Sequence, residues 1–397
     1  MERVLTPAEE LRVRIERFQA ALRKKGLQGA LISQNVDLFY FSGTTQRSLL
    51  YIPQEGLPVL MVQKSLDRAR DESALELIEP IEVIRDIPRV LRSHGIDSPR
   101  AMGLEFDVLP VAYFMRFQKV FPEVSFSDVS FLIRQVRMVK TAFEIDQIEK
   151  AIRVIETVLT KLKESIQEGL TELEVDGCVR AWTRREGDQG RLRMRGWNQE
   201  MFHAHVLSGK TAAIPSFTET PIGGPGTTPA IAQGSGFNRI GRNEPVLVDL
   251  GAGVNGYIAD VTRTFVIGRL PERFYEGYGV LRDIQALFES EARPGILCSH
   301  LYQEAVRLAE ARGFGAYFMG FGPDKVSFLG HGLGLEIDEL PVLARRYPSP
   351  LEEGVVCAVE PKMVFPGEGA IGLEDDYLIT DRGAKKLSHF EDGIIHL

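Results

Sequence analysis

The sequence has few cysteines, no long hydrophobic run and no excess of positive charge, and each absence excludes a class of protein. The three cysteines (Cys178, Cys298 and Cys357) are too far apart for a disulfide framework or a Cys-x-x-Cys metal site. The 397 residues include 47 Lys and Arg against 55 Asp and Glu, a net charge of −8, so we predict no nucleic-acid or membrane partner. The longest uncharged stretch, 220–238, is rich in glycine, proline and threonine and is unsuited to span a bilayer.

Several common catalytic motifs are also missing. There is no HExxH motif, and Ser208 lacks the G-x-S-x-G setting of a hydrolase nucleophile. Gly209-Lys210-Thr211 resembles the end of a P-loop, but residue 204 is alanine where that motif needs its first glycine. Residues 1–4 lead directly into charged helical sequence, so we expect no signal peptide and a cytoplasmic location.

The first part of the chain alternates helical sequence with short apolar segments. A first helix is predicted to have Thr6 as its cap, with Glu9 completing a capping box, and to end at Gly26. Short strands are predicted at 29–33, 58–62, 81–84 and 101–104. This alternation predicts an α/β domain over residues 1–137.

The second part, residues 138–397, begins with a long helical pattern. From Ile145 to Ile166 the apolar residues recur every three or four positions, and Gly169 ends the pattern. A coiled coil is one interpretation, but the stop at Gly169 favours a single helix on a sheet. Thr171 and Glu174 form a capping box that predicts a second helix.

A similar arrangement follows later in the chain. Segments 274–291 and 301–311 are predicted to form another helix pair. Each pair is followed by strand sequence that carries acidic residues, at 246–260 and at 355–376. The order helix, helix, sheet therefore occurs twice, and we hypothesise an α+β domain with an internal pseudo-two-fold duplication.

Two of these acids lie in a predicted hairpin. Asp249 interrupts an apolar run, and Asn255-Gly256 is a strong signal for a two-residue turn. That turn pairs Asp249 with Thr262 and places Asp260 on the same face, diagonal to Asp249. Two buried carboxylates on one face repel unless a positive charge lies between them. The alternative is one aspartate bonded to backbone and another exposed at the turn.

Two glutamates flank a second turn. Glu360 ends the apolar run 355–360, and Glu374 follows the turn sequence 366–369. A four-residue loop places the two carboxylates on opposite faces of the hairpin. They share a face only with a loop of three or five residues or with a bulge, and we predict one of these arrangements.

His331 lies between the two acidic hairpins in the sequence Gly330-His331-Gly332. A single histidine among glycines is often only a turn residue. The alternative is a metal site, because glycines allow the backbone to approach a crowded centre closely. One imidazole and four carboxylates suit two divalent ions, and this donor set favours Mn²⁺, Co²⁺, Fe²⁺ or Zn²⁺.

These motifs resemble those of the pita-bread metallopeptidases, which include methionine aminopeptidase, aminopeptidase P, prolidase and the metal-free relative creatinase. The matching segments are VDLGAGVNGYIADVTRTFVIG at 248–268, GHGLGLEID at 330–338, VEP at 359–361 and LEDDYLIT at 373–380. By this resemblance the metal ligands are Asp249, Asp260, His331, Glu360 and Glu374. The resemblance also implies a creatinase/prolidase-like domain over 1–137, a pita-bread catalytic domain over 138–397 and a homodimer.

The resemblance further implies metal-assisted hydrolysis of a small peptide or peptide-like substrate. Two divalent ions supply the nucleophile and polarise the peptide carbonyl, while Glu360 shuttles the proton. Thr262 is placed to hold a metal-bound carboxylate. The expected activity is release of the N-terminal residue at X-Pro bonds, as in an Xaa-Pro aminopeptidase or dipeptidase.

The sequence departs from the family pattern at three substrate-side positions. Relatives usually carry a histidine where this chain has Asp338, another at or near Ala232, and an arginine at Gly372. We predict that His205 and Asp338 serve as catalytic residues in their place. For His205, the alternative is that His203 and His205 have no special role.

Two further questions stay open from the sequence. The segment 221–238 has 5 glycines and 3 prolines in 18 residues, and it is either a lid over the site or a surface insertion. The missing histidines also allow a metalloenzyme with lyase-type or other small-molecule chemistry. A binding module without turnover predicts a broken ligand set, which the sequence does not have.

Overall fold

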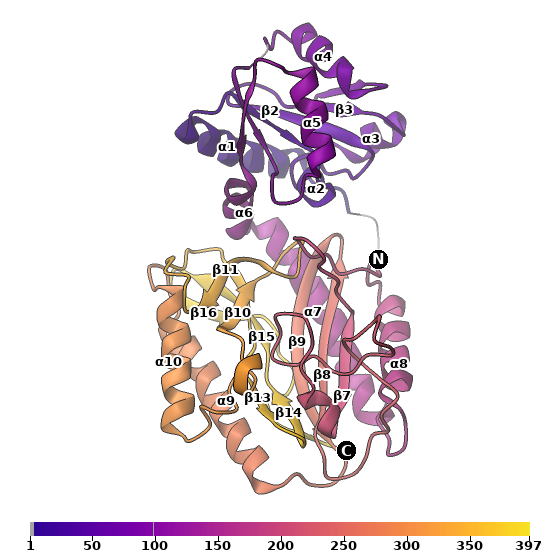
Figure 1. Ribbon diagram of the computed structural model, residues 1–397, viewed down its shortest axis with the longest axis vertical. Helices are drawn as coiled ribbons and strands as arrows, with labels where there is room; N and C mark the ends of the chain where they lie inside the picture. The colour runs from indigo at the N-terminus through magenta and orange to yellow at the C-terminus, as the bar shows by residue number, and fades with distance from the viewer. Residues whose placement is uncertain (1–3, 98) are drawn as a thin grey trace. The chain divides into compact units, whose positions relative to one another are not determined.

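The computed structural model describes residues 4–97 and 99–397, which form two compact units (Figure 1). The first unit is Met1–Arg137 with Arg195–Gln199, and the second is Met138–Met194 with Glu200–Leu397. The short segment Arg195–Gln199 lies in the predicted second region but belongs to the first unit. Residues 1–3, on which the expected absence of a signal peptide partly depends, lie outside the described residues. Within the described chain, no helix combines the length and apolar character needed to cross a membrane.

The first unit is built on a six-stranded mixed sheet with the order β4-β3-β2-β1-β5-β6. Its strands are β1 Gly29–Ile32, β2 Ser48–Pro53, β3 Val59–Val62, β4 Leu77–Pro80, β5 Ala101–Leu104 and β6 Ser125–Asp128. Its helices are α1 Ala8–Lys25, α2 Asn35–Ser42, α3 Leu66–Glu72, α4 Ile87–Ser93, α5 Val111–Val120 and α6 Ser130–Met138, with a short 3₁₀ turn at Ile84–Asp86. Alternate residues of the central strands pack against α4 and α5, while α1 and α2 contact β1 and β2.

Two details of this unit differ from the predictions. Helix α1 begins at Ala8 with Pro7 as its cap residue, and no side chain caps it. Glu9 bonds Arg12 (2.8 Å) on the helix surface, so the predicted capping box with Thr6 is wrong. The predicted strand at 81–84 is also wrong, because the strand lies earlier, at Leu77–Pro80, and the chain turns at Ile84. Helix α1 does end at Gly26, whose φ is +74°.

The second unit contains two larger sheets and a two-stranded ribbon. The strands of the first sheet, in the order β17-β9-β8-β7, are β7 Ala204–Ser208, β8 Val246–Val254, β9 Tyr257–Val266 and β17 Ile395–His396. Those of the second sheet, in the order β11-β10-β12-β15-β16, are β10 Phe328–Gly332, β11 Glu339–Ala344, β12 Val356–Val359, β15 Asp375–Thr380 and β16 Gly383–Lys386. The ribbon consists of β13 Lys362–Phe365 and β14 Gly369–Gly372.

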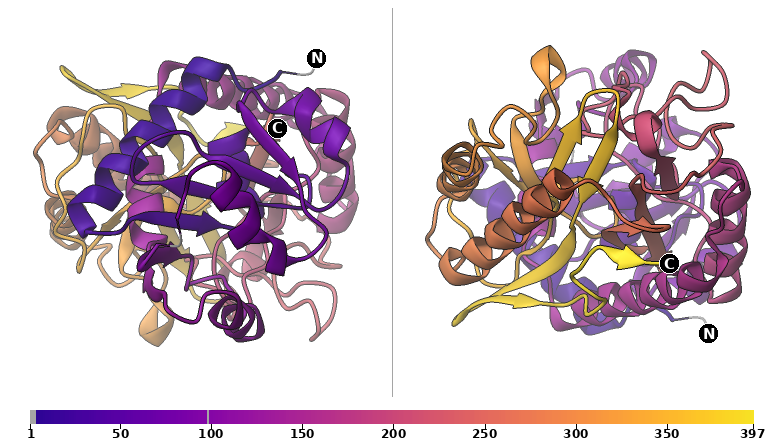
Figure 2. Two further views of the ribbon diagram at one scale, coloured as in Figure 1. Left: turned by 90° about the horizontal axis from the view of Figure 1, so that it is seen from above. Right: turned by 90° about the horizontal axis from the view of Figure 1, so that it is seen from below.

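Two pairs of helices cover the sheets of the second unit. They are α7 Ala142–Ser165, α8 Glu172–Arg185, α9 Glu272–Glu291 and α10 Cys298–Ala311, and short 3₁₀ turns lie at Gly209–Ala213 and Gly322–Asp324. Helix α7 packs on β8 and β9, as predicted for a helix on a sheet, whereas α9 and α10 pack with the second sheet and the ribbon (Figures 1 and 2). Each half thus contributes two helices followed by strands, which is the predicted order.

The first acidic hairpin has the predicted register. Val254 pairs with Tyr257 across a two-residue turn, and Asp249 pairs with Thr262. Asn255 and Gly256 both have positive φ, +51° and +96°, as this tight turn requires. Asp260 faces Gly251, two residues from Asp249 along β8, so the two aspartates share one face of the hairpin.

Candidate metal centre

The five side chains predicted as metal ligands come from separate elements of the second unit. Asp249 lies on β8, Asp260 on β9 and His331 on β10. Glu360 directly follows β12, and Glu374 directly precedes β15. Four of the five residues are buried, and Asp249 is partly buried, with its side chain 14% exposed.

The second hairpin brings the two glutamates together through its loop length. Phe365 pairs with Gly369, which leaves a loop of three residues, one of the predicted alternatives. Lys362 pairs with Gly372 in the ribbon, and Val359 pairs with Asp375 in the second sheet. The same register therefore continues from the ribbon into the sheet. Glu360 and Glu374 lie opposite each other in that register, so both carboxylates are on the same side of the chain.

Glycines on both sides of His331 allow β10 to pack closely between its neighbours. A Cβ atom on Gly330 would lie 2.1 Å from the carbonyl oxygen of Ala358, and one on Gly332 would lie 2.1 Å from that of Leu340. The imidazole of His331 is held between two acids. Its Nε2 lies 3.4 Å from Glu360 Oε1, and its Nδ1 lies 3.4 Å from Asp338 Oδ1.

Three of the predicted ligands form a compact group that could hold a cation. The ligand atoms of Asp260, His331 and Glu374 all lie within 4.8 Å of one another. Asp260 Oδ1 and Glu374 Oε1 are buried and have no hydrogen-bond partner among the described residues. Buried carboxylate oxygens without donors are costly unless a proton or a metal ion satisfies them, so this donor set fits a divalent ion.

Lys362 was not predicted as part of the site, and its ammonium lies inside the same cluster. Its Nζ is 2.5 Å from Glu360 Oε2, 3.2 Å from Glu374 Oε2 and 3.5 Å from Asp249 Oδ2. The side chain is only 1% exposed. A signal for it was present, because a residue two positions after Glu360 in an extended segment lies on the same side as Glu360.

The acids of the cluster are buried close to one another, and their pKa values are shifted as a result. Burial, followed by the charges of Glu374 and Asp249, raises the pKa of Asp260 well above its usual value. Burial, opposed by Lys362, raises the pKa of Glu374 to about 7, with Glu360 and Asp249 adding to the rise. Burial also acts to raise the pKa of Glu360, but Lys362 and His331 outweigh it and lower that pKa to about 2.

The two basic groups of the cluster show the complementary effect. Burial acts to lower the pKa of Lys362, but Asp249, Glu360 and Glu374 hold it well above its ordinary value. Burial likewise acts to lower the pKa of His331, while Asp338, Glu360 and Asp260 raise it well above the usual range. The cluster therefore attracts positive charge strongly.

Neighbouring groups hold the ligand carboxylates in place. Thr262, predicted to support a ligand, donates its hydroxyl to Glu374 Oε2 (2.5 Å). The backbone N–H of Asp260 donates to Asp376 Oδ2 (3.2 Å), which joins the two hairpins. Asp376 is a further buried acid that the sequence analysis did not single out.

His205 lies beside the cluster on β7. It pairs directly with Asp249 across the strands, and its Nε2 is 3.1 Å from the side-chain nitrogen of Gln233. Burial lowers the pKa of His205, so the imidazole is neutral near pH 7. His203 precedes β7 and lies 3.8 Å from Asp188, away from these contacts.

The segment 221–238 packs against β7 and α8 at several points. Gln233 and Gly234 lie next to the His205 ring, and the N–H of Gly236 donates to Glu172 (2.8 Å). Residues 228–231 are largely exposed. Ala232, the position of a usual histidine, accepts a hydrogen bond from Ser216 through its carbonyl oxygen (2.6 Å).

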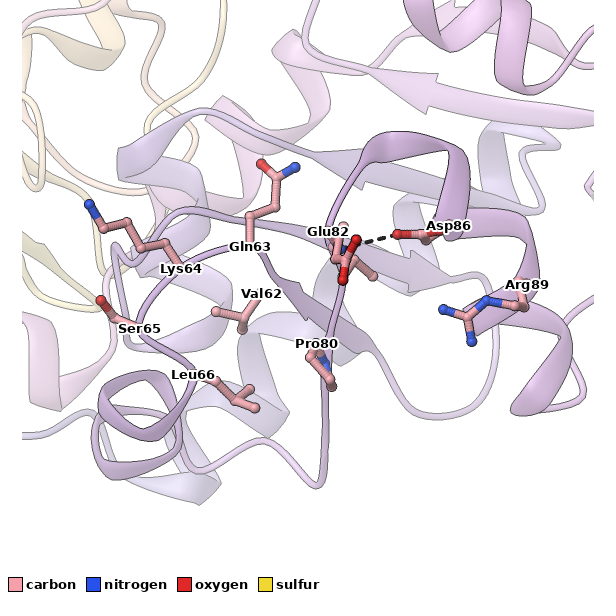
Figure 3. Close-up of a pocket in the computed structure, with 10 residues that line it drawn as sticks. Val62, Gln63, Lys64, Ser65, Leu66, Pro80, Glu82, Asp86 and Arg89 are labelled. Atoms are coloured by element: carbon pink, nitrogen blue, oxygen red, sulfur yellow. Dashed lines mark hydrogen bonds between the residues drawn. The ribbon is translucent and has the colours of Figure 1, made fainter.

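A separate pocket lies in the first unit, and no residue predicted as part of the site lines it. Glu82 and Asp86 meet there through a backbone N–H of Glu82 that donates to Asp86 (3.1 Å; Figure 3). The pocket is lined by charged residues of both signs, uncharged polar residues and apolar residues, namely Val62, Gln63, Lys64, Ser65, Leu66, Pro80, Ile81, Glu82, Asp86 and Arg89. Nothing in its lining resembles the carboxylate cluster of the second unit.

Comparison with known proteins identifies both parts of the chain. Residues 146–381 match the model of metallopeptidase family M24, and residues 14–139 match that of the creatinase/prolidase N-terminal domain. The chain is 28% identical to an Xaa-Pro dipeptidase of Pyrococcus furiosus over 96% of this chain and 99% of that protein.

Solved structures show the same similarity. The prolidase of Pyrococcus horikoshii has a TM-score of 0.80 at 27% identity, covering 96% of this chain and 99% of its own. An X-Pro aminopeptidase of Thermotoga maritima has a TM-score of 0.79 at 25% identity, covering 96% and 99%. The predicted fold class, an α/β N-terminal domain with a pita-bread C-terminal domain, is confirmed.

Proposed function

Because the chain belongs to metallopeptidase family M24, we propose that it is a hydrolase that releases the N-terminal residue from peptides at X-Pro bonds. The metallopeptidases of this family use two divalent metal ions. Support for X-Pro specificity comes from relatives named Xaa-Pro dipeptidase at 28% and 27% identity over nearly the whole chain. These relatives favour peptide hydrolysis over lyase-type chemistry.

The proposed metal ligands are Asp249, Asp260, His331, Glu360 and Glu374. The observation that carries the proposal is the convergence of Asp260, His331 and Glu374 within 4.8 Å. In that group, buried oxygens of Asp260 and Glu374 have no hydrogen-bond partner among the described residues. When bound, divalent ions supply a Lewis acid and lower the pKa of water enough for attack at neutral pH. The identity of the ions is proposed only as far as Mn²⁺, Co²⁺, Fe²⁺ or Zn²⁺.

Glu360 is the proposed proton carrier. Its lowered pKa leaves the carboxylate ionised at neutral pH, so it can accept a proton from water and pass it to the leaving amine. His331, 3.4 Å away, and Lys362, 2.5 Å away, hold this carboxylate in position.

His205 and Asp338 have different proposed roles. His205 is neutral, and it lies beside Asp249 at the edge of the cluster, which suits contact with a substrate carbonyl or amine. Asp338 is half exposed, and its contact with His331 Nδ1 suits a role in orienting the imidazole.

A homodimer in the cytoplasm is also proposed. Both statements rest on the resemblance to aminopeptidase P and prolidase and on the composition of the chain. Size-exclusion chromatography with light scattering tests the dimer.

Peptide hydrolysis is tested with chelated protein to which Mn²⁺ or Co²⁺ has been returned. We expect release of the first residue from X-Pro peptides and weaker release from X-Ala peptides. Replacing Glu360 with Ala should lower kcat/KM by about 10²–10⁴-fold, because proton transfer is lost. Glu353→Ala, at an exposed turn, is the control and should keep the full rate. Bound metal without turnover of any peptide would instead favour small-molecule chemistry.

A further inference from the structure

The cluster of acids contains a cation that belongs to the chain itself. Lys362 Nζ contacts Glu360, Glu374 and Asp249, three of the five proposed ligands. Because metal–oxygen distances are about 2.0–2.2 Å, a divalent ion bound to these same oxygens would stand very close to Nζ. Two positive charges at such a distance repel strongly in a buried site. The ammonium and an ion therefore exclude each other from this position.

The position of the ammonium follows from the packing of the lysine stem. Lys362 pairs with Gly372 across the ribbon, and a Cβ atom on Gly372 would lie 3.0 Å from Lys362 Cγ. The glycine thus leaves the space through which the stem passes. The backbone of Lys362 is also held, since its carbonyl oxygen accepts a hydrogen bond from the N–H of Met319 (2.9 Å). With a side chain 1% exposed, the lysine has little freedom to swing toward solvent.

The other side of the cluster differs. Asp260, His331 and Glu374 lie within reach of one ion, and no ion pair among the described residues joins Lys362 to Asp260 or His331. The unpartnered oxygens, Asp260 Oδ1 and Glu374 Oε1, are in this group. The position formed by Asp260, His331 and Glu374 therefore has donor atoms that need a cation. The position beside Asp249 and Glu360 already holds the ammonium of Lys362.

We propose that Lys362 competes with a divalent ion for Asp249, Glu360 and Glu374, and so weakens metal binding at the position that these three residues form. The position formed by Asp260, His331 and Glu374 fills first and tightly. The second ion binds only when the ammonium is displaced, and so it binds weakly. This inference rests on the ligand assignment of the proposed function, and it adds a residue that controls how that centre is loaded.

The proposal is tested by metal binding rather than by activity. Chelated wild-type chain is titrated with Mn²⁺ by calorimetry, and the metal retained after dialysis is measured by mass spectrometry. We expect one retained ion per wild-type chain and a second, weaker binding step. Lys362→Met removes the charge and keeps the length of the side chain. In this variant the second ion should bind at least roughly tenfold more tightly, a difference of about 1.4 kcal/mol.

A matched control is Lys140→Met, because Lys140 is equally buried and pairs with Glu339 (3.0 Å) outside the cluster. It should keep the wild-type binding curve. Two equal binding steps in the wild type, or an unchanged curve in Lys362→Met, would overturn the proposal. Where Lys362→Met fails to fold, Lys362→Gln removes the same charge and is read in the same way. If neither protein binds metal, the ligand assignment itself fails, and the proposed function fails with it.

Discussion

Each unit of the chain contains a buried cluster of charged groups, and the two clusters are balanced differently. In the first unit, Asp37 accepts hydrogen bonds from Arg137 and Arg195, each at 2.7 Å, and Arg195 also bonds Asp107 (2.6 Å). The third acid near Asp37 is Glu105, whose pKa is raised well above its usual value by burial and then by the charge of Asp37. Asp37 and Asp107 thus each have a guanidinium partner.

In the second unit the acids outnumber the cations. Asp249, Glu360 and Glu374 share one lysine, Lys362, and oxygens of Asp260 and Glu374 have no donor among the described residues. Balanced buried charge is a structural arrangement, because the partners satisfy each other. Buried carboxylates that outnumber their cationic partners need protons or metal ions from solution, and so they indicate a binding site.

The largest expected effect comes from unbalancing the first cluster. Arg137→Met leaves Asp37 buried with one fewer partner, and we expect the free energy of unfolding to fall by about 3–5 kcal/mol. Urea unfolding followed by circular dichroism measures the loss. Metal content should not change, since this cluster holds no proposed ligand.

The control for that variant is Arg12→Met. Arg12 pairs with Glu9 and Glu16 on the exposed surface of α1, where solvent screens the charges. Its unfolding curve should match that of the wild type. An equal fall in the free energy of unfolding in both variants would mean that buried and exposed ion pairs contribute equally to stability. That result would contradict the comparison between the two clusters.

A smaller effect is expected at the edge of the second cluster. Asp338→Asn removes the charge beside His331 Nδ1 and should weaken metal binding by about 10–100-fold. If Asp338 only orients the imidazole, kcat recovers at saturating metal. A kcat that stays low with the metal sites full would instead make Asp338 a catalytic residue. Asp381→Asn, on an exposed turn, serves as the control and should leave metal affinity unchanged.

The smallest effect concerns Glu105 and its pH dependence. Its pKa is raised in the folded state, so the folded chain binds the proton more tightly than the unfolded chain does. Its contribution to stability is therefore fully present below the unfolded pKa of about 4.3 and is lost as the pH rises toward the folded value. Glu105→Gln has no such group, so its stability relative to the wild type should improve modestly as the pH rises. Urea midpoints from pH 5 to 8 test this, and a constant difference between the two proteins would contradict it.

Much of the candidate site followed from local sequence patterns. The pairing of Asp249 with Thr262 is set by Asn255-Gly256, because a two-residue turn leaves a single register. The capping box at Thr171 and Glu174 is present, since it depends on residues three apart. Thr6 is not the cap of the first helix, because the neighbouring Pro7 takes the cap position. The sequence offered both residues, and local pattern did not decide between them.

Other features depended on contacts between distant segments. The position of Lys362 relative to Asp249 requires the ribbon and the first sheet to meet, and its spacing from Glu360 does not predict that meeting. The contact between Gln233 and His205 likewise joins an irregular segment to a strand. No periodic pattern predicts where such a segment packs.

The sequence by itself determined the helical stripes, the register of the first acidic hairpin and the order of the five donor residues, because turn geometry and side-chain periodicity act over a few neighbouring positions. Tertiary structure alone decided that an ammonium shares the centre with those donors, that Asp338 faces His331, and that Arg195, from the later part of the chain, joins the charged cluster of the first unit. The physical reason is that a buried charge takes its partner from whatever segment packs beside it, and packing between segments far apart in the chain is a property of the whole fold.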